Sequence, residues 1–185
     1  MRIIAGQWRG RTLIAPKGDA TRPTADRTRE ALFSMLVSRL GSFDDLRVAD
    51  LFAGTGALGL EALSRGAARC TFVENDRVAL DALKANITAL GATGADVRGS
   101  SVMALGQANE PFDLVLIDPP YESGAGSVAL DKLARQGWIT ASTLVSIETS
   151  KRETVSVAGF ETDVVRDYGK ARITLLRRAE NAGRI

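Results

Sequence analysis

Apolar and polar residues follow two different spacings along this chain. Apolar residues at helical spacing predict a first helix over about 24–40, ended by Gly41, and further helices over 58–65, 77–90 and about 128–136. Short apolar runs between the helices predict strands over 47–52, 69–74, 96–98, 112–118 and 144–149. Strands that alternate with helices predict an α/β fold with an open, mostly parallel sheet.

Both ends of the chain depart from that alternation. Residues 2–14, with two glycines around Trp8, predict a short two-stranded hairpin. Near the other end, β-rich segments over about 161–166 and 171–177 flank a turn at Tyr168 and Gly169, so we expect an antiparallel end to the sheet. Ligands of parallel sheets bind beyond the carboxyl ends of the strands, so the residues that end the strands are the functional candidates.

The composition narrows the chemistry that such a sheet can support. A chain of 185 residues that is 45% apolar can bury the core of one soluble domain. With no histidine and one cysteine, Cys70, the chain excludes a Ser-His-Asp or Cys-His catalytic set, a histidine-ligated metal and an intrachain disulfide. Apolar stretches fall short of the roughly 20 residues of a membrane span, and Gly6 interrupts any secretion signal, so we expect a cytoplasmic protein.

Positive charge is concentrated at the start of the chain. The first 29 residues hold seven basic side chains against two acids, a net charge of +5, whereas the remaining residues carry −3. Six of the seven basic residues are arginine, which pairs with phosphate and stacks on bases better than lysine does. The segment predicts contact with a polyanion, the alternative being a solvated arm without a specific partner.

A glycine-rich turn follows the strand over 47–52. Gly54, Gly56 and Gly59 match the pattern G-x-G-x-x-G, and Glu74 ends the next strand 20 residues after Gly54. This context predicts an adenosine-containing cofactor whose ribose hydroxyls bind the carboxylate, the alternative being a turn that needs glycine only for packing. Asp50, just before the glycines, would repel a pyrophosphate and suits a cationic ammonium, such as that of S-adenosylmethionine.

The strand over 112–118 ends in the sequence Asp118-Pro119-Pro120-Tyr121. Two prolines hold the backbone extended and remove two N–H donors, which leaves the Asp118 carboxylate and the Pro119 carbonyl as acceptors beside an aromatic ring. These groups suit an exocyclic amine on a planar base, because two acceptors take its hydrogens while Tyr121 stacks on the base. A proline-stiffened turn with a buried tyrosine is the alternative.

These motifs resemble those of class I amino-methyltransferases, which use S-adenosylmethionine. The sequence over 6–11 and 22–36 is similar to that of the bacterial 16S rRNA (guanine-N2)-methyltransferases. The resemblance implies a Rossmann-like fold with a seven-stranded, mostly parallel sheet, an antiparallel C-terminal hairpin and a small N-terminal β-hairpin. It further implies a basic arm over 1–22, a methyltransferase domain over 23–185, a monomer, and 16S rRNA in a partly assembled or complete small ribosomal subunit as the substrate.

The resemblance also assigns roles to individual residues. Catalytic positioning is implied for Asp118, Pro119 and Tyr121, and RNA contacts are expected at Arg9, Arg11, Arg22 and Arg29. Cofactor contacts, including closure of the cofactor pocket, are implied at Asp50, Phe52, Ala53, Gly54, Gly56, Glu74, Asn75, Ser100, Ser101, Val102, Thr24, Arg27 and Glu30. Many relatives carry an acid after the third strand for the adenine amine. Here two serines and Val102 stand there instead, so a hydroxyl, backbone groups or apolar packing would have to serve.

The expected reaction transfers a methyl group from S-adenosylmethionine to the exocyclic N2 of a specific guanine in 16S rRNA. The base would be unstacked and inserted beside Tyr121, and N2 would attack the methyl group in line while Asp118 offsets the charge on nitrogen. An adenine-N6 methyltransferase fits the motif at 118–121 equally well. An NAD-dependent oxidoreductase fits the glycines and Glu74 but leaves that motif unexplained, and a non-catalytic RNA-binding module fits only the arginines.

Overall fold

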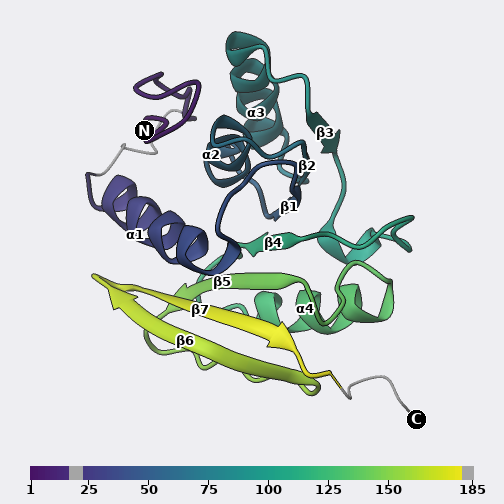
Figure 1. The fold of residues 1–185 in the computed structure, drawn as a ribbon. Coiled ribbons are helices and arrows are strands. Elements are labelled where there is room, and N and C mark those ends of the chain that lie inside the picture. Colours follow the sequence, from purple (N-terminus) through teal and green to yellow (C-terminus); the bar gives the residue numbers. More distant parts are fainter. Residues whose placement is uncertain (17–22, 181–185) are drawn as a thin grey trace.

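A computed structural model describes residues 1–16 and 23–180. Its seven strands form one sheet in the order β3-β2-β1-β4-β5-β7-β6 (Figure 1). The strands are β1 (Arg47–Leu51), β2 (Arg69–Val73), β3 (Ala95–Arg98), β4 (Leu114–Ile117), β5 (Leu144–Ser150), β6 (Phe160–Tyr168) and β7 (Ala171–Arg178). β1 to β5 run parallel, and β7 pairs antiparallel with both β5 and β6. The predicted sheet and its antiparallel end are confirmed.

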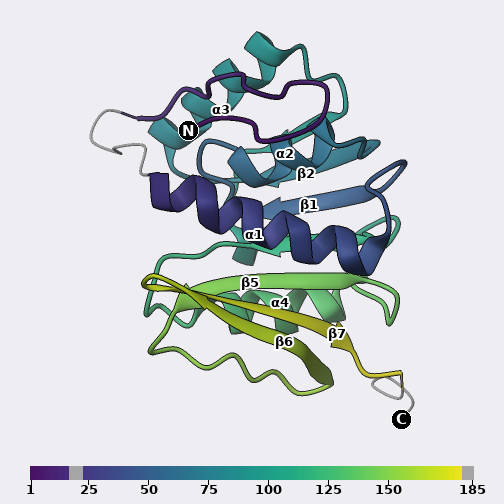
Figure 2. The same ribbon diagram turned by 60° about the vertical axis from the view of Figure 1, so that its left-hand side comes forward.

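Helices cover both faces of this sheet. One face carries α1 (Pro23–Leu40), α2 (Ala57–Ser64) and α3 (Arg77–Leu90), and the other carries α4 (Ala125–Arg135) and the short helix η1 (Val102–Ala104). Figure 2 shows α1 running along its face of the sheet beside α2. Within the described ranges, no helix combines the length and the apolar character that crossing a bilayer requires.

The two faces hold separate apolar clusters because side chains alternate along each strand. In β1, Val48 belongs to the cluster that includes Phe33 of α1 and Leu60 of α2. The next residue, Ala49, belongs instead to the cluster that includes Leu130 of α4. Asp50, two positions after Val48 in β1, therefore faces α1 and α2. The acidic side chains at the strand ends can meet on this face of the sheet.

The N-terminal segment packs against the helices of the first face. Arg2 and Thr12 form an antiparallel bridge, so the segment folds back on itself as predicted, although one isolated bridge takes the place of two strands. Ile3 and Leu13 are buried in the same cluster as α1, α2 and α3. Glu61 of α2 accepts hydrogen bonds from backbone N–H groups of the segment, which holds it in place.

Candidate active site

Three acidic side chains lie on one face of the sheet, at the carboxyl ends of three neighbouring strands. Asp50 of β1 is opposite Leu116 of β4, and Asp118 follows two positions later on the same face. Ile117 of β4 pairs with Ile147 of β5, so the residues that follow them, Asp118 and Glu148, are neighbours. All three acids line one cavity of about 620 Å³, a volume typical of small-molecule sites.

The turn between β1 and α2 forms another wall of this cavity. Phe52 and Gly54 both line it and both have a φ of +57°, in the left-handed region. A Cβ atom on Gly54 would meet no protein atom within 4 Å, so this glycine leaves room for a ligand beside the backbone. A Cβ atom on Gly59 would lie 2.4 Å from Cε1 of Phe72, so that glycine serves the packing of helix on strand.

Glu74 holds the edge of the glycine turn. Its Oε1 accepts a hydrogen bond from Gly54 N–H at 2.9 Å. Its Oε2 accepts hydrogen bonds from the N–H groups of Asn75 and Asp76, at 2.8 and 3.0 Å. The half-buried carboxylate is thereby fixed beside the glycine that leaves room for a ligand.

The Asp50 carboxylate is the most deeply buried acid of the cavity. Its side chain is 1% exposed, and Oδ2 accepts a hydrogen bond from Gly59 N–H at 2.9 Å. Burial raises the pKa of Asp50 to about 8, although the hydrogen bond from Gly59 lowers it and the nearby Glu74 raises it. A cation stabilises the ionised form of a buried carboxylate with so high a pKa. Asp50 therefore fits the ammonium group predicted from the sequence.

Asp118 and Tyr121 meet Glu148 at the far end of the same cavity. Burial raises the pKa of Asp118 well above its usual range, and the charges of Glu148 and Asp50 raise it further. The hydroxyl of Tyr121 donates a hydrogen bond to Oε1 of Glu148 at 2.9 Å, while the tyrosine side chain remains 47% exposed. Pro119 is buried behind them. The cavity therefore presents an aromatic side chain beside a carboxyl group with raised proton affinity.

Comparison with known proteins places the chain in a family. The family described as "Conserved hypothetical protein 95" matches residues 1–177. The chain belongs to this family. Ribosomal RNA small subunit methyltransferase D of Escherichia coli (strain K12) is 42% identical over 150 residues, 80% of this chain and 74% of that protein. The protein of the same name from Haemophilus influenzae is 38% identical over 156 residues, 82% of this chain and 79% of that protein. The family resemblance drawn from the motifs is confirmed.

Solved structures share the fold of this family member. "Putative methyltransferase yhhF from Escherichia coli" superposes with a TM-score of 0.85 at 37% identity, covering 97% of this chain and 98% of that one. Magnesium protoporphyrin IX methyltransferase from Synechocystis, solved with bound SAM, superposes with a TM-score of 0.66 over 88% of this chain and 87% of that one. At 16% identity, this second likeness is one of fold alone. The expected class I methyltransferase fold is confirmed.

Several residues of the cavity wall were not predicted from the sequence. Of these residues, Glu148 alone carries a local signal, because it is an acid inside the strand predicted over 144–149. On α1, which was expected to close the pocket through Thr24, Arg27 and Glu30, other residues line the cavity. The β6–β7 turn, which no local pattern connects with the strand ends, lines it as well. These two elements contribute Ala25, Thr28, Arg29 and Leu32 from α1, and Tyr168, Gly169, Lys170 and Ala171 from the turn.

Two residues expected to close the cofactor pocket lie on another side of α1. Arg27 and Glu30 are exposed and line a separate groove with Arg2 and Arg9 of the N-terminal segment. The expectation that they close the cavity is corrected, because the helix turns their positions away from Ala25 and Thr28. The side chain of Thr24 lies outside the described residues.

The segment after β3 also stands apart from the residues that line the cavity. Ser101 caps η1, with Oγ accepting a hydrogen bond from Met103 N–H at 3.2 Å. Oγ of Ser100 donates to the Ser101 carbonyl at 3.4 Å, and Val102 is buried in the α4-side cluster. The segment follows the end of β3, whose Arg98 carbonyl accepts a hydrogen bond from Glu74 N–H at the end of β2, and the next residue, Asn75, is exposed.

The structure corrects the expectation that Arg29 contacts RNA. Arg29 is 5% exposed, and its guanidinium donates to the carbonyl of Arg2 and pairs with Asp26 at 3.2 Å. A second carboxylate, Glu61, lies 3.8 Å from its Nε. Arg29 therefore joins α1 to the N-terminal segment and to α2. Arg9 and Arg11 are exposed, and Arg22 lies outside the described residues.

Proposed function

We propose that this protein transfers a methyl group from S-adenosylmethionine to the exocyclic N2 of a guanine in 16S rRNA of the small ribosomal subunit. The observation that carries the proposal is one cavity lined both by the glycine turn after β1 and by Asp118 and Tyr121. An oxidoreductase would leave Asp118 and Tyr121 without a role. The names of the relatives support ribosomal RNA as the substrate, and the sequence over 22–36 supports guanine N2.

Asp50 and Gly54 of the cavity, together with Glu74, which is hydrogen-bonded to Gly54, suit S-adenosylmethionine. Asp50 would hold its ammonium group, Glu74 would accept its ribose hydroxyls, and Gly54 leaves space for it beside the backbone. When bound, the cofactor supplies an electrophilic methyl group, so the remaining task of the protein is orientation.

Asp118 and its neighbours would orient the target amine. The Asp118 carboxylate and the Pro119 carbonyl each accept one hydrogen of the amine, which turns the nitrogen lone pair toward the cofactor side of the cavity. The ring of Tyr121 stacks on the base, an interaction worth about 1–3 kcal/mol per base. Because burial raises the pKa of Asp118, its carboxylate binds a proton readily and takes the one that N2 loses.

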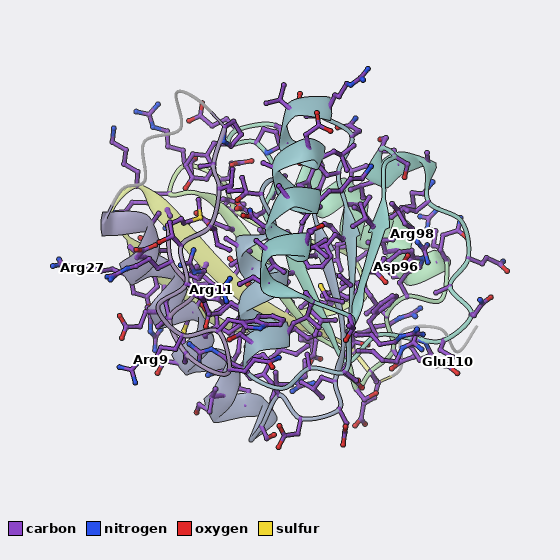
Figure 3. The ribbon with its side chains drawn as sticks, turned by 90° about the horizontal axis from the view of Figure 1, so that it is seen from above. Arg9, Arg11, Arg27, Asp96, Arg98 and Glu110 are labelled. Carbon is purple, nitrogen blue, oxygen red and sulfur yellow. The ribbon has the colours of Figure 1, made fainter. Side chains whose placement is uncertain are left out.

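The RNA backbone would lie in the groove between the N-terminal segment and α1. Arg2, Arg9 and Arg27 line this groove, and none of them forms an ion pair with a carboxylate within the described residues. Asp26 and Glu30 line it too, but Asp26 is already paired with Arg29. Figure 3 shows Arg9 and Arg27 projecting outward on one side of the molecule, away from Asp96, Arg98 and Glu110.

This groove and the cavity are separated by α1, whose first turns line both. A helix is about 10 Å across, so phosphates in the groove would lie within a few nucleotides of the base in the cavity. Phosphate contacts of this kind fix the register of a nucleic acid without reading its sequence. Arg11 belongs to the N-terminal segment. Its guanidinium donates a hydrogen bond to the Ala89 carbonyl at 2.9 Å, which joins this segment to α3.

Transfer of label from tritiated S-adenosylmethionine tests the proposal, with free 16S rRNA and partly assembled small subunits as substrates. Mass spectrometry of the nucleosides is expected to identify N2-methylguanosine. N6-methyladenosine would support the adenine alternative instead, and the absence of transfer to either form of RNA would reject RNA methylation by this protein.

A further inference from the structure

Glu148 is an acid in the middle of the sheet that the proposed reaction leaves without a task. It lies on β5 with Ile173 of β7 opposite it, and it is half-buried. Its neighbour Ile147 belongs to the α4-side cluster, so Glu148 points to the opposite face, the one that carries the cavity. An acid on such a strand is unfavourable for folding unless it has a partner, and its partner is Tyr121.

Tyr121 needs such a partner because the other hydrogen bonds of its loop are made by the residues around it and not by its own side chain. Its side chain is 47% exposed, and the next residue, Glu122, has a φ of +58°. Glu153 holds the loop beyond it by accepting hydrogen bonds from the N–H groups of Glu122 and Gly124, at 2.7 and 3.3 Å. The hydrogen bond to Glu148 is the contact that ties the tyrosine side chain itself to the sheet.

We propose that Glu148 is a positioning residue for methyl transfer, which holds the ring of Tyr121 over the target base by accepting its phenolic hydrogen bond. This inference rests on the proposed function, because it requires a base between Tyr121 and the cofactor. Glu148 touches neither base nor cofactor in this role and acts through Tyr121.

Glu148 also acts on Asp118 through its charge. The two acids are neighbours on β4 and β5, and the charge of Glu148 raises the pKa of Asp118 beyond the effect of burial. Burial likewise raises the pKa of Glu148, while the hydrogen bond from Tyr121 lowers it. Among the described residues, the other charged and titratable groups that line this cavity belong to Asp50, Arg29, Tyr168, Lys170 and Met1, which carries the α-amino group. Removing the charge of Glu148 lowers the pKa of Asp118, so Asp118 stays ionised to lower pH.

A double-mutant cycle tests the positioning role. Tyr121→Phe and Glu148→Ala are each expected to lower kcat/KM for the RNA about three- to tenfold, which corresponds to one hydrogen bond. On the plateau of the pH–rate profile, where Asp118 is ionised in every variant and the charge of Glu148 no longer changes its protonation, the double variant is expected to be no slower than either single variant, because both remove the same contact. The dissociation constant for S-adenosylmethionine should stay within twofold of the original, which also shows that the variants fold. Glu161→Gln, an exposed acid on β6, is the matched control and should change none of these values.

Glu148→Gln separates the hydrogen bond from the charge. The amide oxygen still accepts from Tyr121, so this variant should be faster than Glu148→Ala, while the acidic limb of its pH–rate profile moves to lower pH. Additive losses in the cycle, or an unmoved acidic limb, would overturn the inference. Those results are distinct from failure of the proposed function, in which the unaltered protein transfers no methyl group to RNA.

Discussion

The carboxylate of Glu61 accepts hydrogen bonds from Ile4 N–H at 2.8 Å and from Ala5 N–H at 3.0 Å, which joins the N-terminal segment to α2. Glu61 is 0% exposed, and Arg65 pairs with its Oε2 at 3.0 Å. Arg29, whose pKa is lowered by burial and raised by the charge of Glu61, lies beside it. The N-terminal segment, which forms one side of the groove proposed for RNA, is therefore held in place by a buried carboxylate.

Glu61→Gln is expected to destabilise the protein by about 3–5 kcal/mol, because it removes a buried counter-charge of Arg29 and Arg65 and turns one acceptor of the N-terminal N–H groups into an amide donor. Urea unfolding measures this loss, and limited proteolysis should show earlier cleavage within residues 1–14. The control is Glu110→Gln, which removes an exposed partner of Arg47 and should cost at most about 1 kcal/mol. Equal losses in the two variants would contradict the buried role of Glu61.

Asp50 should link cofactor binding to pH. Its pKa of about 8 means that the folded protein holds a proton there between about pH 4 and pH 8 that the unfolded chain has released. Stability should therefore fall as the pH rises through this range, and Asp50→Asn should remove that part of the fall. A bound ammonium lowers the pKa of Asp50, so binding of S-adenosylmethionine at pH 7 should release a proton. Calorimetry in buffers of different ionisation enthalpy detects it, and an identical heat in every buffer would refute the pairing.

Asp118 is expected to be essential for turnover but not for cofactor affinity. Asp118→Ala should abolish methyl transfer, and Asp118→Asn, which keeps one acceptor but no charge, should lower kcat at least about 100-fold. Both variants should bind S-adenosylmethionine with a nearly unchanged dissociation constant, measured by calorimetry. A variant at this position that turns over normally would show that Asp118 does not hold the amine.

Alanine substitutions at Gly54 and at Gly59 should affect cofactor binding and stability differently. Gly54→Ala places a Cβ in open space at a φ of +57°, so we expect a stability loss of about 1–2 kcal/mol and more than tenfold weaker cofactor binding. Gly59→Ala places its Cβ 2.4 Å from Phe72, so the loss there should be in stability, about 1–3 kcal/mol. Thermal unfolding with and without cofactor separates the two effects, and the same pattern in both variants would disprove the distinction.

The groove arginines should determine how RNA binding depends on salt. Each phosphate contact to a single strand adds about −0.7 to the slope of log affinity against log salt, so Arg9→Ala with Arg27→Ala should flatten the slope by about 1.4. Arg69→Ala with Arg135→Ala removes the same charge from exposed positions outside the groove and serves as the control. If the two double variants give the same slope, the RNA does not lie in the groove.

The sequence was sufficient to predict the helices and strands of the sheet and their class because helical and alternating apolar spacings are local properties. Gly54, Glu74 and Asp118 were identified for the same reason, since each stands where a predicted strand ends. Gly56 and Gly59 belong to the same glycine pattern, which the sequence shows. In the structure, Gly54 leaves room for a ligand, whereas Gly59 allows close packing of helix on strand.

Only the tertiary structure decided how the charged side chains are used. Arg27 and Arg29 are two positions apart in one basic segment, yet Arg27 reaches an exposed groove while Arg29 is buried against carboxylates. From the sequence, Glu148 is simply one acid in a predicted strand. It meets its partner Tyr121 because parallel pairing brings β4 beside β5. The direction in which a helix or strand points a side chain, and what it meets there, depends on residues distant in the chain, and packing of the whole molecule sets that partner.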